Sequence, residues 1–127
     1  MIAIDLQQYL QASAGVSTDS IFPHVMHADH KGSAILYKQE SSRFTYSFNG
    51  DDDLISSVVE LVILDKRFDV AVALAQEVEL VLRDFTGTFV TGSHSVERTQ
   101  FLNEYTAFDA DIERYVVVFE LDITYHR

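Results

Sequence analysis

The sequence predicts an α+β fold, a mostly antiparallel sheet with two helices packed on one face. Segments with strand-like alternation lie both before and after one long helical segment, and strands do not alternate regularly with helices. The two helical segments, one at the N-terminus and one in the middle of the chain, are each amphipathic. A length of 127 residues fits one domain, which we expect to span 1–127.

In the first half of the chain, the sequence predicts one helix and three strands, and the stretch IFPHVMH is expected to form either a further short strand or an extended loop. A helix is expected over 2–14, since apolar residues recur there at helical spacing before Gly15. Two short strands are expected over 34–40 and 43–49, separated by a polar break at Ser41–Ser42. A charged turn follows in the stretch GDDD, and the third strand covers residues 54–64.

The strand over 54–64 has apolar side chains on both faces. Its two sets of residues are Ser57, Val59, Leu61 and Ile63 on one face, and Val58, Val62 and Leu64 on the other, where Glu60 interrupts them. Exposed apolar surface of this extent is unusual in a soluble monomer. Both faces are therefore expected to be covered, either by elements of the same domain or by another subunit.

In the second half of the chain, the sequence predicts a long helix followed by strands. The helix over 67–85 has an apolar stripe consisting of Val70, Leu74, Val78, Val81 and Phe85. Asp65 or Asp69 is expected to cap its N-terminus or to complement its dipole there, and Gly87 follows its end. An irregular strand is expected near 88–102 and a turn around Asp109–Asp111. The chain then finishes in a long alternating strand, from Tyr115 to Tyr125.

The composition excludes some function classes. Twenty acidic residues against nine basic ones give a net charge of −11, and the lysines and arginines form no cluster, which disfavours binding to nucleic acid or to an anionic membrane. No apolar run is long enough to span a bilayer, and the N-terminus lacks the pattern of a secretory signal. The chain has no cysteine, which excludes disulfides and thiolate chemistry.

The stretch FPHVMHADHKG raises the possibility of a metal site, because imidazole is a common metal ligand. His24, His27 and His30 are each three residues apart, a spacing that spreads them around a helix or places His27 on the opposite face of a strand. Only an irregular loop could bring all three together, with His94 as a distant fourth ligand. We therefore interpret them as solvated histidines and expect no metal, no cofactor and no catalytic residue.

The whole series of elements resembles the phage tail-terminator, or tail-completion, proteins typified by the minor tail protein U of phage lambda. The resemblance is carried by the N-terminal segment LQQYLQASAGV, the strand VELVIL, the helix DVAVALAQEVELVL and the final strand ERYVVVFELDITY. It covers nearly the whole chain. The chain departs from the family pattern where AILYKQ lacks a preceding proline, and in its extra histidines.

The resemblance implies a non-enzymatic subunit that assembles as a ring, commonly a hexamer. Such a ring caps the finished tail tube and joins the tail to the head connector, in the virion tail and, during assembly, in the bacterial cytoplasm. We expect Val58, Val62 and Leu64 to form a subunit interface. Asp51, Asp52 and Asp53 are expected to form a loop near the lumen, where acidic charge would repel DNA.

Two alternatives stay open at this point. The chain could be a non-viral binding or regulatory module of the same α+β architecture. It could also be a small metal-dependent enzyme that uses the histidine segment.

Overall fold

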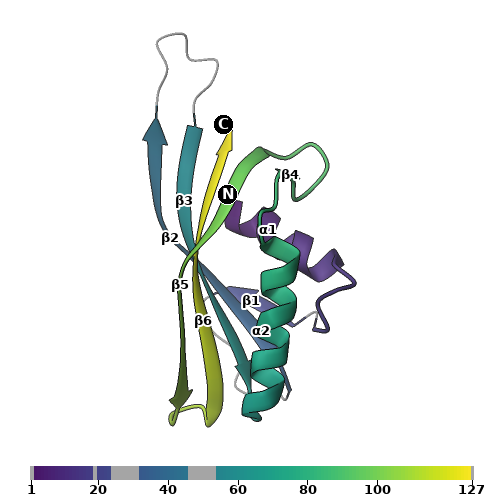
Figure 1. Ribbon diagram of the computed structural model, residues 1–127, viewed down its shortest axis with the longest axis vertical. Coiled ribbons are helices and arrows are strands. Elements are labelled where there is room, and N and C mark those ends of the chain that lie inside the picture. The colour runs from purple at the N-terminus through teal and green to yellow at the C-terminus, as the bar shows by residue number, and fades with distance from the viewer. Residues whose placement is uncertain (1, 19, 24–31, 46–53, 127) are drawn as a thin grey trace.

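The computed structural model describes residues 2–18, 20–23, 32–45 and 54–126, and it confirms the predicted α+β class. Two helices lie on one face of a six-stranded, strongly twisted sheet (Figure 1). In chain order the elements are α1 (Ile2–Ala12), β1 (Ile21–Pro23), β2 (Ala34–Thr45), β3 (Leu54–Asp65), α2 (Phe68–Leu82), β4 (Gly87–Thr88), β5 (Ser95–Asp109) and β6 (Arg114–His126).

The strand order across the sheet is β1-β2-β3-β6-β5-β4. Four long strands, β2, β3, β6 and β5, form the centre, and each pairs with its neighbour in antiparallel fashion. The short strand β1 adds to one side by parallel pairing with β2, and β4 adds to the other side by antiparallel pairing with β5. Among the strands that the structure describes, β1 and β2 are therefore the one parallel pair.

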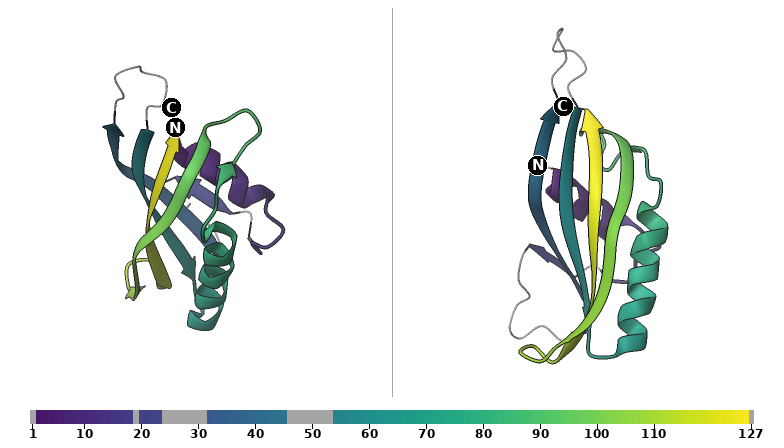
Figure 2. Two further views of the ribbon diagram at one scale, coloured as in Figure 1. Left: turned by 45° about the horizontal axis from the view of Figure 1, so that its top comes forward. Right: turned by 60° about the vertical axis from the view of Figure 1, so that its left-hand side comes forward.

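The main core lies between the sheet and the two helices, which cover the same face (Figure 2). Leu6 and Leu10 of α1 and Leu74, Val78 and Leu82 of α2 are almost fully buried there. Alternate residues of the central strands supply the other half of this core: Ile55, Val59, Leu61 and Ile63 of β3, and Val117, Phe119, Leu121 and Ile123 of β6. The period of two expected for strands with one face on a core is therefore present in both.

The opposite face of the sheet, called here the helix-free face, has a smaller apolar cluster at one end. It contains the buried residues Ala34, Leu64, Val116 and Val118, with Phe22, Leu36 and Val62 packed against them. The register explains this cluster, because Ala34 pairs with Leu64 and Leu64 pairs with Val116 across three strands. Both faces of β3 are thus apolar and largely covered at this end. The cover comes from the same chain, which is one of the two possibilities expected from its sequence, the other being a second subunit.

Two strand boundaries differ from the sequence prediction. The expected break at Ser41–Ser42 is instead a register shift between Gln39 and Ser41 inside one continuous strand, β2. The strand can continue through these polar residues because the Ser42 hydroxyl has a hydrogen-bond partner on β3, with its Oγ 2.8 Å from Ser57 Oγ. The strand expected near 88–102 runs instead from Ser95 to Asp109. Its second half is exposed on both faces, so the sequence has no alternation there that would mark its extent.

The buried stripe of α2 is rotated relative to the prediction. It consists of Ala71, Leu74, Ala75, Val78 and Leu82. Of the predicted stripe, Leu74 and Val78 are buried, whereas Val70, Val81 and Phe85 are only partly buried. The reason is that two alanines, Ala71 and Ala75, face the sheet and allow a close approach that larger side chains would prevent.

The ends of the helices also differ from expectation. The N-cap of α2 is Arg67, which has no side-chain cap bond; Asp65 Oδ1 instead accepts a hydrogen bond from the Arg67 backbone N–H at 2.8 Å. Asp69 lies in the first turn, where its charge complements the helix dipole as expected. Helix α1 ends at Ala12, before the glycine expected to stop it. A Cβ at Gly15 would lie 3.3 Å from Val81 Cγ2, so glycine there lets the turn approach α2 closely.

Neither described helix has the length and hydrophobicity that a membrane span requires.

Candidate functional site: the open edges and the helix-free face of the sheet

One edge of the sheet is formed by β5 and is largely open. The partner strand β4 pairs only with Ser95 and Val96, and no other described strand pairs with the outer side of residues 97–109. Three large apolar side chains on this strand are about half exposed: Leu102 at 50%, Tyr105 at 50% and Phe108 at 53%. A long edge of this kind presents unpaired backbone N–H and C=O groups and is a template for another strand.

The other edge of the sheet is formed by β2. Strand β1 pairs only with residues 35–37, so the outer side of 38–45 has no partner among the described strands. Phe44, near the end of this segment, is 52% exposed. In Figure 1 this part of β2 extends with β3 beyond the layer of the helices. Among the described strands, the sheet thus ends on both sides in a long strand whose outer side is largely unpaired.

A polar hollow of about 390 Å³ lies on the helix-free face beside the β2 edge. Its lining residues are Ser41, Ser42, Arg43, Ser56, Val58 and Asp122. The serines have small side chains, which leaves room, and Ser56 donates a hydrogen bond to Asp122. Among the described residues of the lining, Val58 alone is apolar, and it is half-buried. The hollow could therefore receive one side chain that is partly apolar and partly polar.

A row of charged residues crosses the helix-free face next to the hollow. Glu60 pairs in register with Lys38 on one side and with Glu120 on the other. Burial raises the pKa of Glu60 above its ordinary value of 4.5, and the hydrogen bond that its protonated carboxyl donates to Glu40 and the negative charges of Glu40 and Glu120 raise it further. The positive charge of Lys38 opposes this shift. The row therefore concentrates negative charge at the middle of the face.

The shifted pKa gives an expected pH dependence for the Glu60→Gln variant. Because the folded state holds this proton more tightly than the unfolded state, ionised Glu60 destabilises the fold above its folded pKa. Glu60→Gln should therefore raise the melting temperature at neutral pH. The gain should shrink as the pH falls through the folded pKa towards 4.5, where Glu60 is protonated in the wild type.

Thermal unfolding followed by circular dichroism between neutral and acidic pH measures this effect. Glu113→Gln, at the exposed turn before β6, is the matched control and should show no comparable gain. A lower melting temperature for Glu60→Gln at neutral pH would contradict the assigned repulsion.

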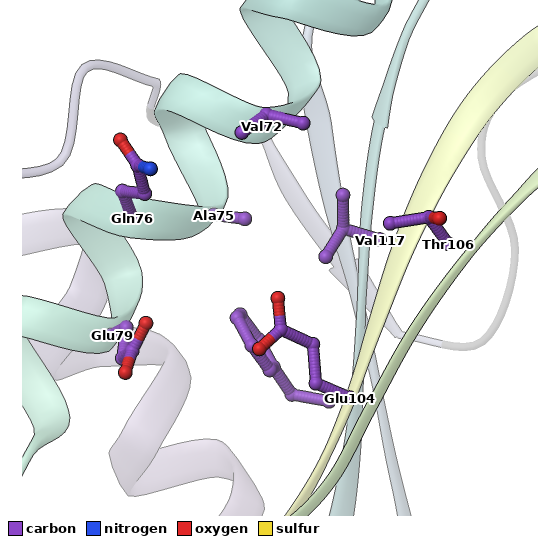
Figure 3. A pocket seen from close by; sticks show the side chains of 8 residues that line it. Val72, Ala75, Gln76, Glu79, Glu104, Thr106 and Val117 are labelled. Carbon is purple, nitrogen blue, oxygen red and sulfur yellow. The ribbon is translucent and has the colours of Figure 1, made fainter.

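A narrow groove separates α2 from β5 and β6, as Figure 3 shows. Glu79 from the helix and Glu104 from β5 point into it from opposite sides. Its volume of about 110 Å³ is below the roughly 300–1,000 Å³ typical of ligand pockets. Arg83 already pairs with Glu79 at 2.7 Å. The groove is thus too small for an ordinary ligand, and one of its two carboxylates is already paired.

The histidine segment cannot be compared with the prediction, because His24, His27 and His30 lie outside the described residues. His94, the proposed fourth ligand, has its Nδ1 atom 3.1 Å from the backbone oxygen of His126. The side chain of His126 in turn contacts Glu97. Over the part of the chain that the structure describes, no three His, Asp or Glu side chains are grouped as metal ligands.

The three residues expected at a subunit interface all lie on the helix-free face, but they differ in exposure. Val58 lines the polar hollow and Val62 packs against the apolar cluster, and both are half-buried. Leu64 is 1% exposed, so the single chain already covers it. The expected lumen loop, Asp51 to Asp53, lies outside the described residues.

Sequence reasoning missed the open edge of β5 and its exposed residues Leu102, Tyr105 and Phe108. Strand alternation could not reveal it, because this segment is exposed on both faces. The available signal was composition, since large apolar side chains recur there among polar ones without forming a buried stripe.

Comparisons with protein-family models and with curated protein sequences found no match. Among solved structures, the chain is similar to a protein chain in the virion of a native gene transfer agent particle. The similarity has a TM-score of 0.76 at 13% sequence identity and covers 98% of this chain and 96% of that one. At this identity the similarity is one of fold. It extends over the complete α+β unit, including the strands that form both open edges.

Proposed function

We propose that this protein is a structural subunit of a phage-like tail, which forms a ring on the finished tail tube and joins it to the head connector. The observation that carries the proposal is the near-complete match in fold to a chain of a phage-like virion particle. The sequence resemblance to tail-terminator proteins supports the finer role. We assign the protein no enzymatic activity and no cofactor.

The partners that we propose are further copies of this chain, most simply six in a ring, the tail tube protein and the head-tail connector. A ring needs a heterologous interface, in which each subunit offers two different surfaces. Two open sheet edges and the half-buried Val58 and Val62 supply candidate surfaces, whereas Leu64 offers little area to a neighbour. The sites of action are the virion tail and, before that, the bacterial cytoplasm where tails assemble.

The charge distribution supports a channel that DNA can pass without binding. The helix-free face carries Glu60, Glu120 and Asp122 in neighbouring positions of β3 and β6. If the helices lie on the outside of the ring, this face lines the lumen and repels the phosphate backbone. The loop Asp51 to Asp53 remains our proposed contribution to the same lumen.

Electron microscopy of tail tubes tests this function. Tubes polymerised from the tail tube protein of the same particle, mixed with the purified protein, should show additional ring-shaped density at one end and should stop growing. Tubes without the protein serve as the control and should continue to lengthen. Binding along the tube walls, or no binding, would contradict the proposed role.

A further inference from the structure

We infer that neighbouring copies join by backbone pairing between the open edge of β5 in one subunit and the open edge of β2 in the next. This inference rests on the proposed function and specifies its interface. The partner is a second copy of this chain, and the ring would contain one sheet that continues from subunit to subunit.

The directions of the strands permit this pairing. Each neighbour in the series β2, β3, β6, β5 is antiparallel to the last, so β2 and β5 run in opposite directions. When copies are related by rotation about an axis roughly along the strands, β5 of one copy lies antiparallel to β2 of the next. The alternation of directions then continues without a break across the subunit boundary, so the backbones of the two edges run in the sense that antiparallel pairing needs.

The charges of the two edges are complementary. Residues 38–45 of β2 contain the bases Lys38 and Arg43 and one acid, a balance of +1. Residues 97–109 of β5 contain one base and three acids, Glu97, Glu104 and Asp109, a balance of −2. In a chain whose total charge is −11, a positive edge segment is unusual. Pairing of β2 with β5 brings opposite charges together, whereas pairing of two β5 edges would bring like charges together.

The hollow beside β2 provides a place for an exposed side chain of β5. Tyr105 pairs with Val118, so it lies on the helix-free face, and it is 50% exposed. Ser41 pairs with Val58 on the same face. A tyrosine on a strand paired to β2 would lie over Ser41 with its ring and reach with its hydroxyl towards Val58 and Ser56 of β3, one strand further in.

Disulfide trapping tests the pairing directly, because the natural chain has no cysteine. Ser41→Cys on β2 is combined in turn with one cysteine on β5. The helix-free series is Gln100→Cys, Asn103→Cys, Tyr105→Cys and Ala107→Cys, and the opposite-face series is Glu104→Cys and Thr106→Cys. Within one chain the two strands are three strand spacings apart, about 14 Å, too far for a disulfide, which needs Cα atoms within about 7 Å.

The expected result is a ladder of covalent oligomers longer than dimers, sensitive to reductant, for at least one member of the helix-free series. The opposite-face series should give little product, because those side chains point to the other side of the sheet. Ser41→Cys alone can form at most dimers and is the second control. Equal ladders from both series would overturn the pairing.

The outcomes separate this inference from the proposed function. A preparation that sedimentation shows to be oligomeric, but that gives no ladder with any helix-free pair, overturns the edge pairing and leaves the ring proposal standing. A preparation that stays monomeric at all salt and protein concentrations, with no ladder and no binding to tail tubes, overturns both.

Discussion

Replacing Leu74 with alanine is expected to lower the free energy of unfolding by about 2–5 kcal/mol, the range for a buried leucine truncated to alanine. Leu74 is 2% exposed and lies in the middle of the buried stripe of α2, between Ala71 and Val78. Its methyl groups fill the space between the helix and the sheet. Their removal leaves a cavity that two neighbouring alanines are too small to fill.

Gln76→Ala, on the exposed face of the same helix, is the matched control and should change stability by less than about 0.5 kcal/mol. Urea unfolding of both variants, followed by circular dichroism at low ionic strength, measures the two effects in the same background. If Gln76→Ala cost more stability than Leu74→Ala, the assignment of the buried face of α2 would be wrong.

Val58→Asp is expected to abolish assembly while leaving the fold intact. The substitution places a carboxylate in the hollow next to Asp122, where we propose that a side chain of the neighbouring subunit sits. Two nearby carboxylates repel one another and keep the hollow hydrated. Since Val58 is only half-buried and its surroundings are polar, the monomer should tolerate the charge. Sedimentation at high ionic strength, where the wild type should associate, measures the loss.

Leu80→Asp is the matched control for this variant. Leu80 is also apolar but lies on α2, is 70% exposed and is not among the residues that line the hollow. It adds the same charge to the subunit without touching the proposed interface, so its assembly should follow that of the wild type. Equal loss of assembly in both variants would assign the effect to net charge rather than to the hollow.

The fold class could be predicted because alternation and helical spacing are local properties of the sequence. Strand β6 illustrates this from Phe119 to Tyr125, where buried and half-buried residues alternate, whereas Val116 to Phe119 are buried on both faces. The buried face of α2 was harder to predict, because a stripe drawn through the large apolar residues overlooks the small ones, Ala71 and Ala75. In the structure those two alanines are buried, whereas the larger Leu80 is 70% exposed.

The candidate interface could be predicted only in part. The apolar character of both faces of β3 indicated a second covered surface, and the structure places Val58 and Val62 on it. The hollow around Val58, however, is formed by residues of β2, β3 and β6, and only the register of three strands brings Ser41 and Asp122 together. An open strand edge is likewise a property of the assembled sheet, which no local pattern reveals.

The mass of the purified protein as a function of ionic strength tests the ring most directly. Each subunit has a net charge of −11, so repulsion between copies should hold the protein in monomeric or weakly associated form at low salt, and screening should relieve it. Analytical ultracentrifugation should therefore show a shift, as salt is raised, towards one discrete closed species, which we expect to contain six copies. A single monomeric species at every salt and protein concentration would contradict the account.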